Sequence, residues 1–371
     1  MDITKDLYHS SGLVINNKLN WLLIMGPIAL LGDATGLLGE TACFAFSGIA
    51  LIPCAERLSF VTEQVAEHTN GTIGALLNAT FGNAPELLIA SAALRKGFYR
   101  VVQLAMLGSM LTNLLFVFGV SCLIGGLRWQ VQELRITSGN VSVGMLLLSV
   151  AGSLLPATLI LGGQLKKSSS SSSSDKLQFC RVNAFVMIFM YGCYLIFQLG
   201  THKEEFDEDE NVVQTANHTQ LHLSPHFTSL GILWLFIITC GVSAMSDILV
   251  DTIDGFAIRL RISEVFTSMV IVPFFSNVAE QVSAILFAYR NEMDLAVGVT
   301  VGSAIQVASF VLPGCVIMGW LFDRSMTLYF HAYETVSLFL AVIVVAAVLQ
   351  GGTTNWLVGA TCISVYVMIA S

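Results

Sequence analysis

Long apolar runs follow one another along almost the whole of this 371-residue chain. A helix needs about 20 mainly apolar residues to cross a bilayer, because lipid offers the backbone no hydrogen-bond partners. Eleven such runs can be drawn, at residues 21–38, 40–58, 71–94, 101–126, 138–163, 178–199, 228–257, 263–289, 294–320, 327–349 and 354–371. The pattern predicts an all-α polytopic membrane protein with about 11 transmembrane helices.

The composition excludes an ordinary soluble domain. Charged residues make up 11% of the chain, against about 25% in soluble domains. The eight cysteines lie in or beside apolar runs without Cys-x-x-Cys spacing, so we expect buried thiols rather than metal ligands or disulfides. We expect a lipid bilayer around the chain, no prosthetic group and no nucleic-acid partner, and the oligomeric state stays open.

The first apolar run begins near Trp21, after about twenty mostly polar residues, and it lacks a small-residue cleavage pattern at its end. We therefore expect no cleaved signal peptide and a retained first helix. Lysines and arginines are shared between both sides when the helices are threaded alternately, so the positive-inside rule leaves the orientation open.

Two longer interruptions separate the apolar runs. Residues 166–176 contain seven consecutive serines, which predict a flexible linker. Residues 201–227 hold four histidines and six acids, the acids all between Glu204 and Glu210. This second segment is either an ordinary solvated loop or one that attracts or senses cations near a permeation mouth.

Two short phrases in apolar surroundings nearly repeat each other: Gly-Asn-Ala-Pro-Glu at residues 82–86 and Ser-Asn-Val-Ala-Glu at residues 276–280. A Gly-Ser pair follows each phrase at the same distance, at residues 108–109 and 302–303. Matches in register at this many positions indicate an internal repeat.

The repeat divides the chain into four parts. Five helices from 40 to 199 match five from 228 to 371, and an odd number in each half gives the halves opposite orientations. Inverted repeats of this kind are typical of secondary transporters. We expect an N-terminal segment with the first helix (1–39), a first five-helix repeat (40–200), an acidic and histidine-containing loop (201–227) and a second five-helix repeat (228–371).

Each repeated phrase ends on a carboxylate, Glu86 or Glu280. The glycine and proline of the first phrase predict a break in its helix, because glycine permits unusual backbone angles and proline removes an amide donor. Asn83 and Asn277 lie one helical turn before the glutamates, on the same helix face. Two carboxylates with several neutral oxygens suit a hard divalent cation such as calcium.

The third helix of each half adds polar side chains, Ser109, Thr112 and Asn113 in one and Ser303 and Gln306 in the other. These could complete the oxygen shell of a cation or could hydrogen-bond between helices. For the two serines both interpretations stand equally. For Asn113 and Gln306, at similar depth, we favour a role in the cation site.

The surroundings of the two glutamates favour exchange. No Lys, Arg or His lies at comparable depth in any of the eleven runs, which disfavours a structural ion pair. A charge at mid-bilayer costs about 3 kcal/mol on insertion scales. The glutamates should therefore be protonated or cation-bound, which indicates that protons and one divalent cation compete for the pair.

Further acids lie near the expected helix ends. Asp251 lies four residues after Asp247 and three before Asp254, so these side chains could share one helix face. An access vestibule for cations or protons and an ordinary interfacial face explain the acids equally well. The set comprises Glu56, Glu63, Asp247, Asp251, Asp254 and Glu264.

The motifs resemble those of the cation/proton exchangers of the calcium/cation antiporter superfamily, whose best-known members are vacuolar calcium/proton antiporters. The resemblance is carried by residues 78–89 and 108–115 in the first half, and by residues 277–280, 293–299 and 302–306 in the second. It spans nearly the whole chain.

The resemblance implies an inverted five-plus-five repeat with the first helix outside it, and an acidic segment between the halves. It also implies that Glu86 and Glu280 bind the cation and carry the exchanged protons, with Asn83, Asn277 and Gln306 nearby. The membrane implied is that of the vacuole or another acidic organelle.

The second phrase departs from the family pattern at two positions. The family usually has glycine and histidine where this chain has Ser276 and Gln281, and Gln281 cannot take up a proton. The acidic position that corresponds to Glu56 in the first half is Asp247 in the second, with a shorter side chain. Proton coupling and the preference between calcium and manganese therefore stay open.

Together these features predict an antiporter that exchanges calcium for protons by alternating access. We expect no enzymatic activity, because no His-Glu-x-x-His or Gly-x-Ser-x-Gly motif lies in the runs. A sodium-coupled calcium exchanger and a manganese/proton exchanger are alternatives of the same architecture. A calcium-selective channel is an alternative of another class, although inverted repeats with broken helices fit carriers better.

Overall fold

The computed structural model of the protein describes residues 18–67, 69, 74, 77–78, 80–161, 171–202 and 227–371. In these residues eight helices are long and apolar enough to cross a membrane, and two shorter apolar helices cover Leu19–Thr35 and Trp356–Ala370. The chain is a helical polytopic membrane protein, as its hydropathy predicts. The total of eleven helices stays a prediction.

The helices form two compact units. The first comprises the described parts of Met1–Ala93, Glu210–Thr267 and Phe275–Ala279. The second comprises those of Leu94–Asp209, Ser268–Phe274 and Glu280–Ser371. Both units draw on residues before and after the 201–227 loop, which itself lies almost entirely outside the described residues.

The first unit is built around one long helix, α3. Helices α2, α11 and α12 all pack on α3, and the Phe44 ring of α3 stacks on Phe256 of α12 with centroids 4.1 Å apart. The elements are η1 (Lys18–Ile24), α2 (Met25–Thr35), α3 (Glu40–Glu67), most of α5 (Ala84–Lys96), α11 (Phe227–Asp251), α12 (Ile253–Leu260) and α13 (Glu264–Phe266).

The second unit contains two long helices with a π-helical segment in the middle. One is α6 (Tyr99–Leu111), η2 (Thr112–Val117) and α7 (Phe118–Arg128). The other is α15 (Met293–Gln306), η5 (Val307–Val311) and α16 (Leu312–Leu321). Each π segment follows a Gly-Ser pair within a few residues. Single π turns inside α-helices are rare and frequently mark functional sites.

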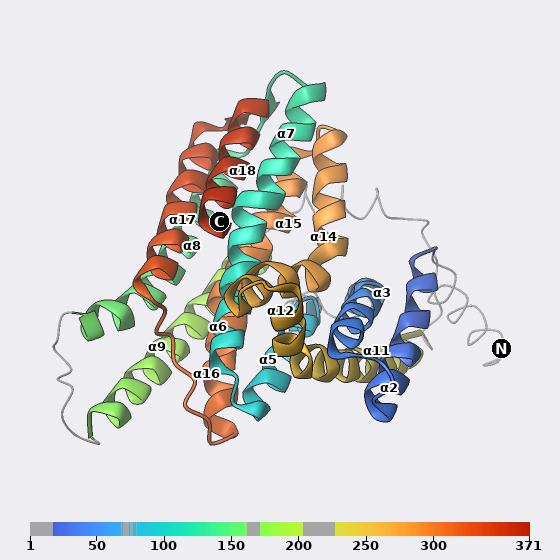
Figure 1. Ribbon diagram of the computed structural model, residues 1–371. Helices are drawn as coiled ribbons and strands as arrows, with labels where there is room; N and C mark the ends of the chain where they lie inside the picture. Colours follow the sequence, from blue (N-terminus) through green and yellow to red (C-terminus); the bar gives the residue numbers. More distant parts are fainter. Residues whose placement is uncertain are drawn as a thin grey trace. The chain divides into compact units, whose positions relative to one another are not determined.

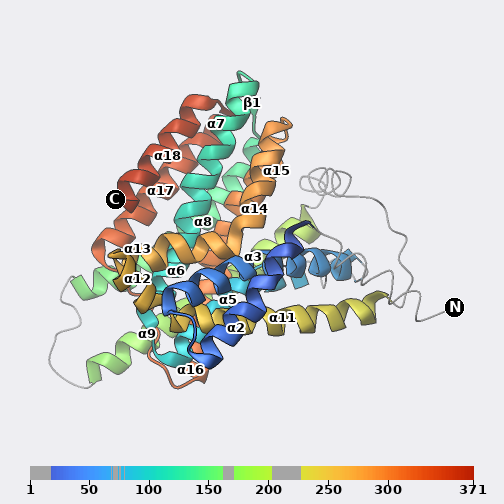
Figure 2. The same cartoon turned by 45° about the vertical axis from the view of Figure 1, so that its right-hand side comes forward.

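Four further helices surround these two: α8 (Ile136–Leu161), α9 (Ser171–Ile196, continued by η3, Phe197–Thr201), α17 (Ala332–Gly351) and α18 (Trp356–Ala370). Figures 1 and 2 show α18 beside α7 and α17 beside α8. Helix α14 (Val272–Tyr289), preceded by η4 (Thr267–Ile271), supplies residues to both units.

A short pair of strands joins two turns of the second unit, which hydropathy did not predict. Strand β1 (Gln132–Glu133) lies antiparallel to β2 (Thr353–Thr354). The β2 turn is set by Gly352, whose φ of 66° ends α17, and by Asn355, whose side chain caps the start of α18. Segments of two residues carry no detectable period-2 pattern, so only the structure shows this pairing.

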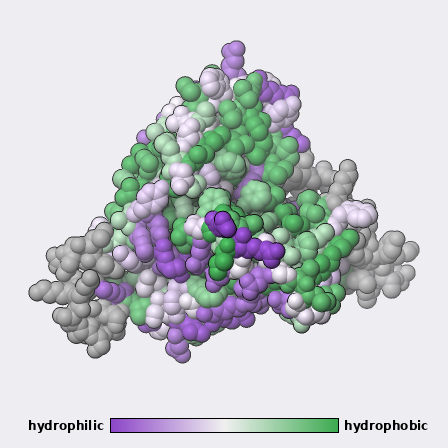
Figure 3. Space-filling view, in the orientation of Figure 1, coloured by the Kyte–Doolittle hydropathy of each residue, from purple (hydrophilic) through white to green (hydrophobic). Residues whose placement is uncertain are grey.

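Exposed apolar side chains are consistent with a lipid-facing surface. On α9, Val182, Phe185 and Phe189 are each more than half exposed. In Figure 3 hydrophobic residues cover the part of the surface over α7 and α18. Patches this large are rare on soluble monomers.

Three boundaries differ from those predicted. Helix α3 continues to Glu67, past the expected end at residue 58, because polar residues near a membrane surface can extend a helix beyond its apolar part. The run at 228–257 breaks at Thr252, between α11 and α12. Helix α9 begins at Ser171, inside the segment expected as a linker, whose residues 166–170 lie outside the described residues.

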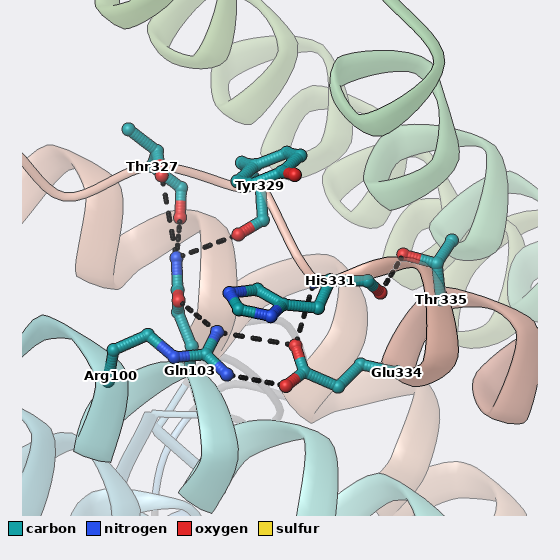
Figure 4. Close-up of polar contacts among 7 residues, drawn as sticks. All are labelled: Arg100, Gln103, Thr327, Tyr329, His331, Glu334 and Thr335. Atoms are coloured by element: carbon teal, nitrogen blue, oxygen red, sulfur yellow. Dashed lines mark hydrogen bonds and ion pairs between the residues drawn. The ribbon is translucent and has the colours of Figure 1, made fainter. Parts of the chain in front are cut away.

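A polar network fastens the start of α17 to the start of α6 (Figure 4). The Arg100 guanidinium pairs with the buried Glu334 carboxylate and also donates to Gln103 at 2.9 Å. Glu334 accepts from the backbone N–H of His331 at 2.9 Å. Gln103 in turn donates to the carbonyls of Thr327 and Tyr329, at 3.0 and 3.1 Å, which holds the segment before α17 in place.

We expect Glu334→Ala to destabilise the protein by about 2–3 kcal/mol, less than a fully buried pair would cost, since the Arg100 side chain is 38% exposed. Glu334→Gln keeps an acceptor for His331 and should cost about half as much. Thermal unfolding of the purified protein in detergent measures both. Equal losses in the two variants would contradict the contribution assigned to the ion pair.

Candidate functional site

Glu86 lies in the first turn of α5, immediately after an interruption of the helical structure. Gly82 and Asn83 form a turn, and the Leu87 N–H donates to the Asn83 carbonyl at 3.1 Å to start the helix. The break predicted from glycine and proline is confirmed. A carboxylate in the first turn is favoured by the helix dipole, by about 0.3–1 kcal/mol at exposed sites.

The two repeated phrases meet at Glu86 within the first unit. The side chains of Ser276 and Asn277, both buried on α14, donate hydrogen bonds to the Glu86 carboxyl group. Their neighbour Phe275 packs on the backbone of α3, since a Cβ at Gly48 would lie 2.6 Å from the Phe275 ring. This close packing holds the second phrase beside the first.

The Glu86 carboxyl group has capacity left for a ligand. Glu86 is 4% exposed, and its Oε1 has no hydrogen-bond partner among the described residues. A buried oxygen left unsatisfied costs about 1–3 kcal/mol. In the described part of the chain no three His, Cys, Asp or Glu side chains cluster closely enough to hold a metal. A cation bound here would therefore depend on neutral oxygens as well as carboxylates.

The second phrase continues into the second unit. Asn83 and Asn277 are each 3% exposed, whereas Glu280 is half-buried in the middle of the unbroken helix α14. The next residue, Gln281, is 6% exposed, and its Nε2 has no hydrogen-bond partner among the described residues. The two phrases thus differ in backbone as well as in sequence.

Asn113 and Ser303 lie in contact in the second unit, from the two helices that carry π segments. The Asn113 side-chain amide donates to the Ser303 hydroxyl at 3.1 Å, and both residues are buried. Ser109 is 1% exposed on α6, and Gln306 is the last residue of α15 before η5. Ser109, Asn113 and Ser303 are therefore buried inside the helix bundle, whereas Gln306 is half-buried.

The second group of acids is less buried. Glu63, Asp251, Asp254 and Glu264 are exposed, and Asp247 is half-buried. The prediction of one helix face shared by Asp251 and Asp254 is wrong, because the break at Thr252 places them on separate helices.

Glu56 lies inside α3 rather than at its end, and it pairs with the neighbouring Arg57. Arg57 is 8% exposed. The expectation that no basic side chain lies at depth is wrong for Arg57, because α3 continues for ten residues beyond it, to Glu67. The ion pair of Arg57 is with Glu56, the preceding residue of the same helix.

Several polar contacts escaped prediction. Ser276 stood out only as a departure from a pattern, yet its hydroxyl contacts Glu86. The hydroxyls of Ser149 and Ser309 lie 2.8 Å apart, as part of the bundle around η5. Hydroxyl groups are frequent in membrane helices, so only the repeat alignment could have drawn attention to Ser276.

The sequence as a whole places this geometry in a family. Residues 39–200 and 230–371 match the model of the sodium/calcium exchanger protein family. The chain belongs to that family. The vacuolar cation/proton exchanger 5 of Arabidopsis thaliana is 39% identical over 367 residues, which cover 97% of this chain and 81% of that one. The vacuolar calcium ion transporter of Schizosaccharomyces pombe is 36% identical, over 97% and 85% of the two chains.

The fold agrees with this membership. A solved structure is that of YfkE, a protein described as a Ca2+/H+ antiporter, and its sequence is 31% identical to that of this chain. It superposes with a TM-score of 0.78 over 95% of this chain and 98% of that one. The likeness extends over almost all of both chains.

Proposed function

We propose that the protein is a secondary antiporter that moves calcium in one direction and protons in the other across a vacuolar membrane. The observation that carries the proposal is the Glu86 carboxyl group, buried in the first turn of α5, contacted by the second repeated phrase and left with one unsatisfied oxygen. The names of its relatives, vacuolar cation/proton exchangers and a vacuolar calcium ion transporter, support the same substrates.

Within this proposal, Glu86 and Glu280 together bind the calcium ion, with Asn83, Asn277, Asn113 and Gln306 as neutral oxygen donors. The support is the repeated Asn-x-x-Glu spacing and the hydrogen bond from Asn277, one helical turn before Glu280, to Glu86. Deprotonated carboxylates attract the hard cation, and protonation removes the charge that holds it. One ligand therefore displaces the other.

Directional transport follows from this competition. On the less acidic side the carboxylates lose their protons and take up calcium, and on the acidic side protons return and calcium leaves. Ser276 and Asn277 keep the Glu86 carboxyl group oriented in both states, because each donates to it without carrying a charge. Alternating access requires only that the occupied site, and not the empty charged one, can change the side of the membrane to which it opens.

Vesicles of purified protein test this function. An imposed pH gradient, acidic inside, should drive uptake of external calcium against its concentration gradient, and collapse of the gradient with a protonophore should stop it. A sodium gradient in place of the proton gradient should drive no uptake, and competition by external manganese measures the preference between the two cations. Uptake driven by sodium, or calcium flux that needs no counter-ion, would overturn the proposal in favour of a sodium-coupled exchanger or a channel.

A further inference from the structure

The second unit contains a cavity of about 150 Å³ between α15, α9, α17 and the start of α8. A single buried water needs only about 10–15 Å³ by a comparable measure, so the cavity has room for several. Its lining includes the polar side chains of Ser142, Tyr194, Gln198 and Gln306. None of the contacts at Glu86 belongs to it.

One face of α15 lines the cavity from end to end. Asp294, Gly298, Gly302 and Gln306 follow each other at intervals of four residues, which places them on the same side of the helix. A Cβ at either glycine would meet no atom within 4 Å, so the missing side chains leave this space open. From Asp294 to Gln306 the helix rises roughly 18 Å, over half of a hydrocarbon core of about 30 Å.

The two ends of the cavity differ in character. At one end Arg135 pairs with Asp294 at 3.8 Å, with side chains 38% and 32% exposed, and the Arg135 N–H donates to Asp294 at 2.9 Å. This end therefore reaches solvent. At the other end Gln306 lies one turn beyond Ser303, which holds Asn113 in the bundle. The cavity thus extends from the partly exposed Arg135–Asp294 pair to Gln306, one turn from the buried contact of Ser303 with Asn113.

Tyr191 indicates which kind of occupant fits the cavity. It lines the cavity and is 2% exposed, yet its hydroxyl has no hydrogen-bond partner among the described residues. A buried hydroxyl without a partner costs about 1–3 kcal/mol, and a water molecule in the adjacent space removes that cost. A lipid chain would leave the hydroxyl unsatisfied, so water is the occupant that fits.

We propose that this cavity holds a chain of water molecules that conducts protons between the aqueous face at Asp294 and the depth of Gln306, so that protons reach the proposed site by a path that calcium does not take. The inference rests on the proposed function. Each water accepts a proton from one neighbour and releases one to the next, and the waters rotate back before the next proton passes. The last water gives its proton to the carboxylates to which the proposed function assigns the exchanged protons. Gln306 cannot be protonated and acts as a positioning residue that orients the last water.

Accessibility tests the water without any transport assay. In Gly298→Cys and Gly302→Cys, a charged thiol reagent should add one label beyond those of the parent protein, counted by intact mass. Gly314→Cys on α16 is the matched control for Gly302→Cys, since both glycines are half-buried and a Cβ at Gly314 also meets nothing within 4 Å but does not line the cavity; it should gain no label. Labelling of residues 298 and 302 by a neutral reagent alone would show a lipid-filled space and overturn the proposal.

Transport tests the proton route. Gly298→Leu fills the cavity and should slow proton-driven calcium uptake at least tenfold while calcium–calcium exchange at equal pH stays within twofold of the parent. Tyr191→Phe should slow uptake severalfold with the same selectivity, and Gly314→Leu should change neither rate. Equal slowing of both exchange modes, or of neither in either cavity variant, would overturn the proposal. Absence of proton-driven uptake in the parent would instead refute the proposed function, because labelling reports the cavity independently.

Discussion

Replacement of Glu86 by glutamine is expected to reduce proton-driven calcium uptake to the level of protein-free vesicles, and Glu280→Gln should do the same. Glutamine keeps the size of the side chain and can still accept from Ser276 and Asn277. It carries neither the negative charge that attracts calcium nor the exchanged proton. Because Glu86 is 4% exposed, bulk water cannot replace the lost ligand.

Calcium binding by the purified protein separates a lost ligand from a lost motion. Each substitution should weaken binding at least tenfold, or about 1.4 kcal/mol, in titration calorimetry. If both carboxylates hold one ion, the two losses of binding free energy should not add in the double variant, because both side chains act on the same ion. The exposed Glu133, changed to Gln, is the matched control and should leave uptake intact. Uptake that survives in Glu86→Gln or Glu280→Gln would refute the site.

Hydropathy predicted the helices well because membrane insertion depends on the sum over a long segment. Local ends were less predictable, as α3 shows: Glu63 and Glu67 are polar, yet the helix includes both. The break at Thr252 was also missed, because a helix interruption changes a few backbone angles and leaves the apolar average of the segment unchanged.

The candidate site was predictable to the extent that chemistry is repeated in the sequence. The spacing of Asn83 and Glu86, repeated in Asn277 and Glu280, identifies both pairs from the sequence alone. The hydrogen bond from Ser276 to Glu86 could not be predicted, because a single serine gives no sign of what it faces. Contacts between distant segments depend on packing, which the period of a helix does not encode.

The cavity illustrates the same limit. The glycines of α15 repeat at intervals of four, which in membranes usually indicates close packing of helices. Gly298 and Gly302 instead face open space, whereas Gly119 and Gly359 let α7 and α18 approach each other closely. Whether a row of glycines packs against another helix or borders a cavity depends on the neighbouring helix. The position of Tyr191 beside this cavity therefore depends on all four lining helices and cannot be predicted from α15 alone.

Gly108→Ala is expected to destabilise the protein strongly, unlike the same substitution at Gly302, the matching glycine of the second half. A Cβ at Gly108 would lie 1.8 Å from the carbonyl oxygen of Met269 in η4, so α6 and η4 could no longer touch. Backbone atoms cannot rotate away as a side chain does. We expect a loss of about 3 kcal/mol or more, at the upper end for overpacking, and a fall in the melting temperature of about 5 °C or more.

Its counterpart in the second half is the matched control. Gly302 follows Glu280 at the same distance as Gly108 follows Glu86, yet a Cβ there meets nothing within 4 Å. Gly302→Ala should therefore leave stability unchanged or raise it by about 0.5–1 kcal/mol, because alanine loses less backbone entropy in a helix. Thermal unfolding in detergent compares the two. Equal effects at both positions would refute the close contact of Gly108 with Met269, while opposite effects would show that the two Gly-Ser pairs have diverged in structure although their sequence is the same.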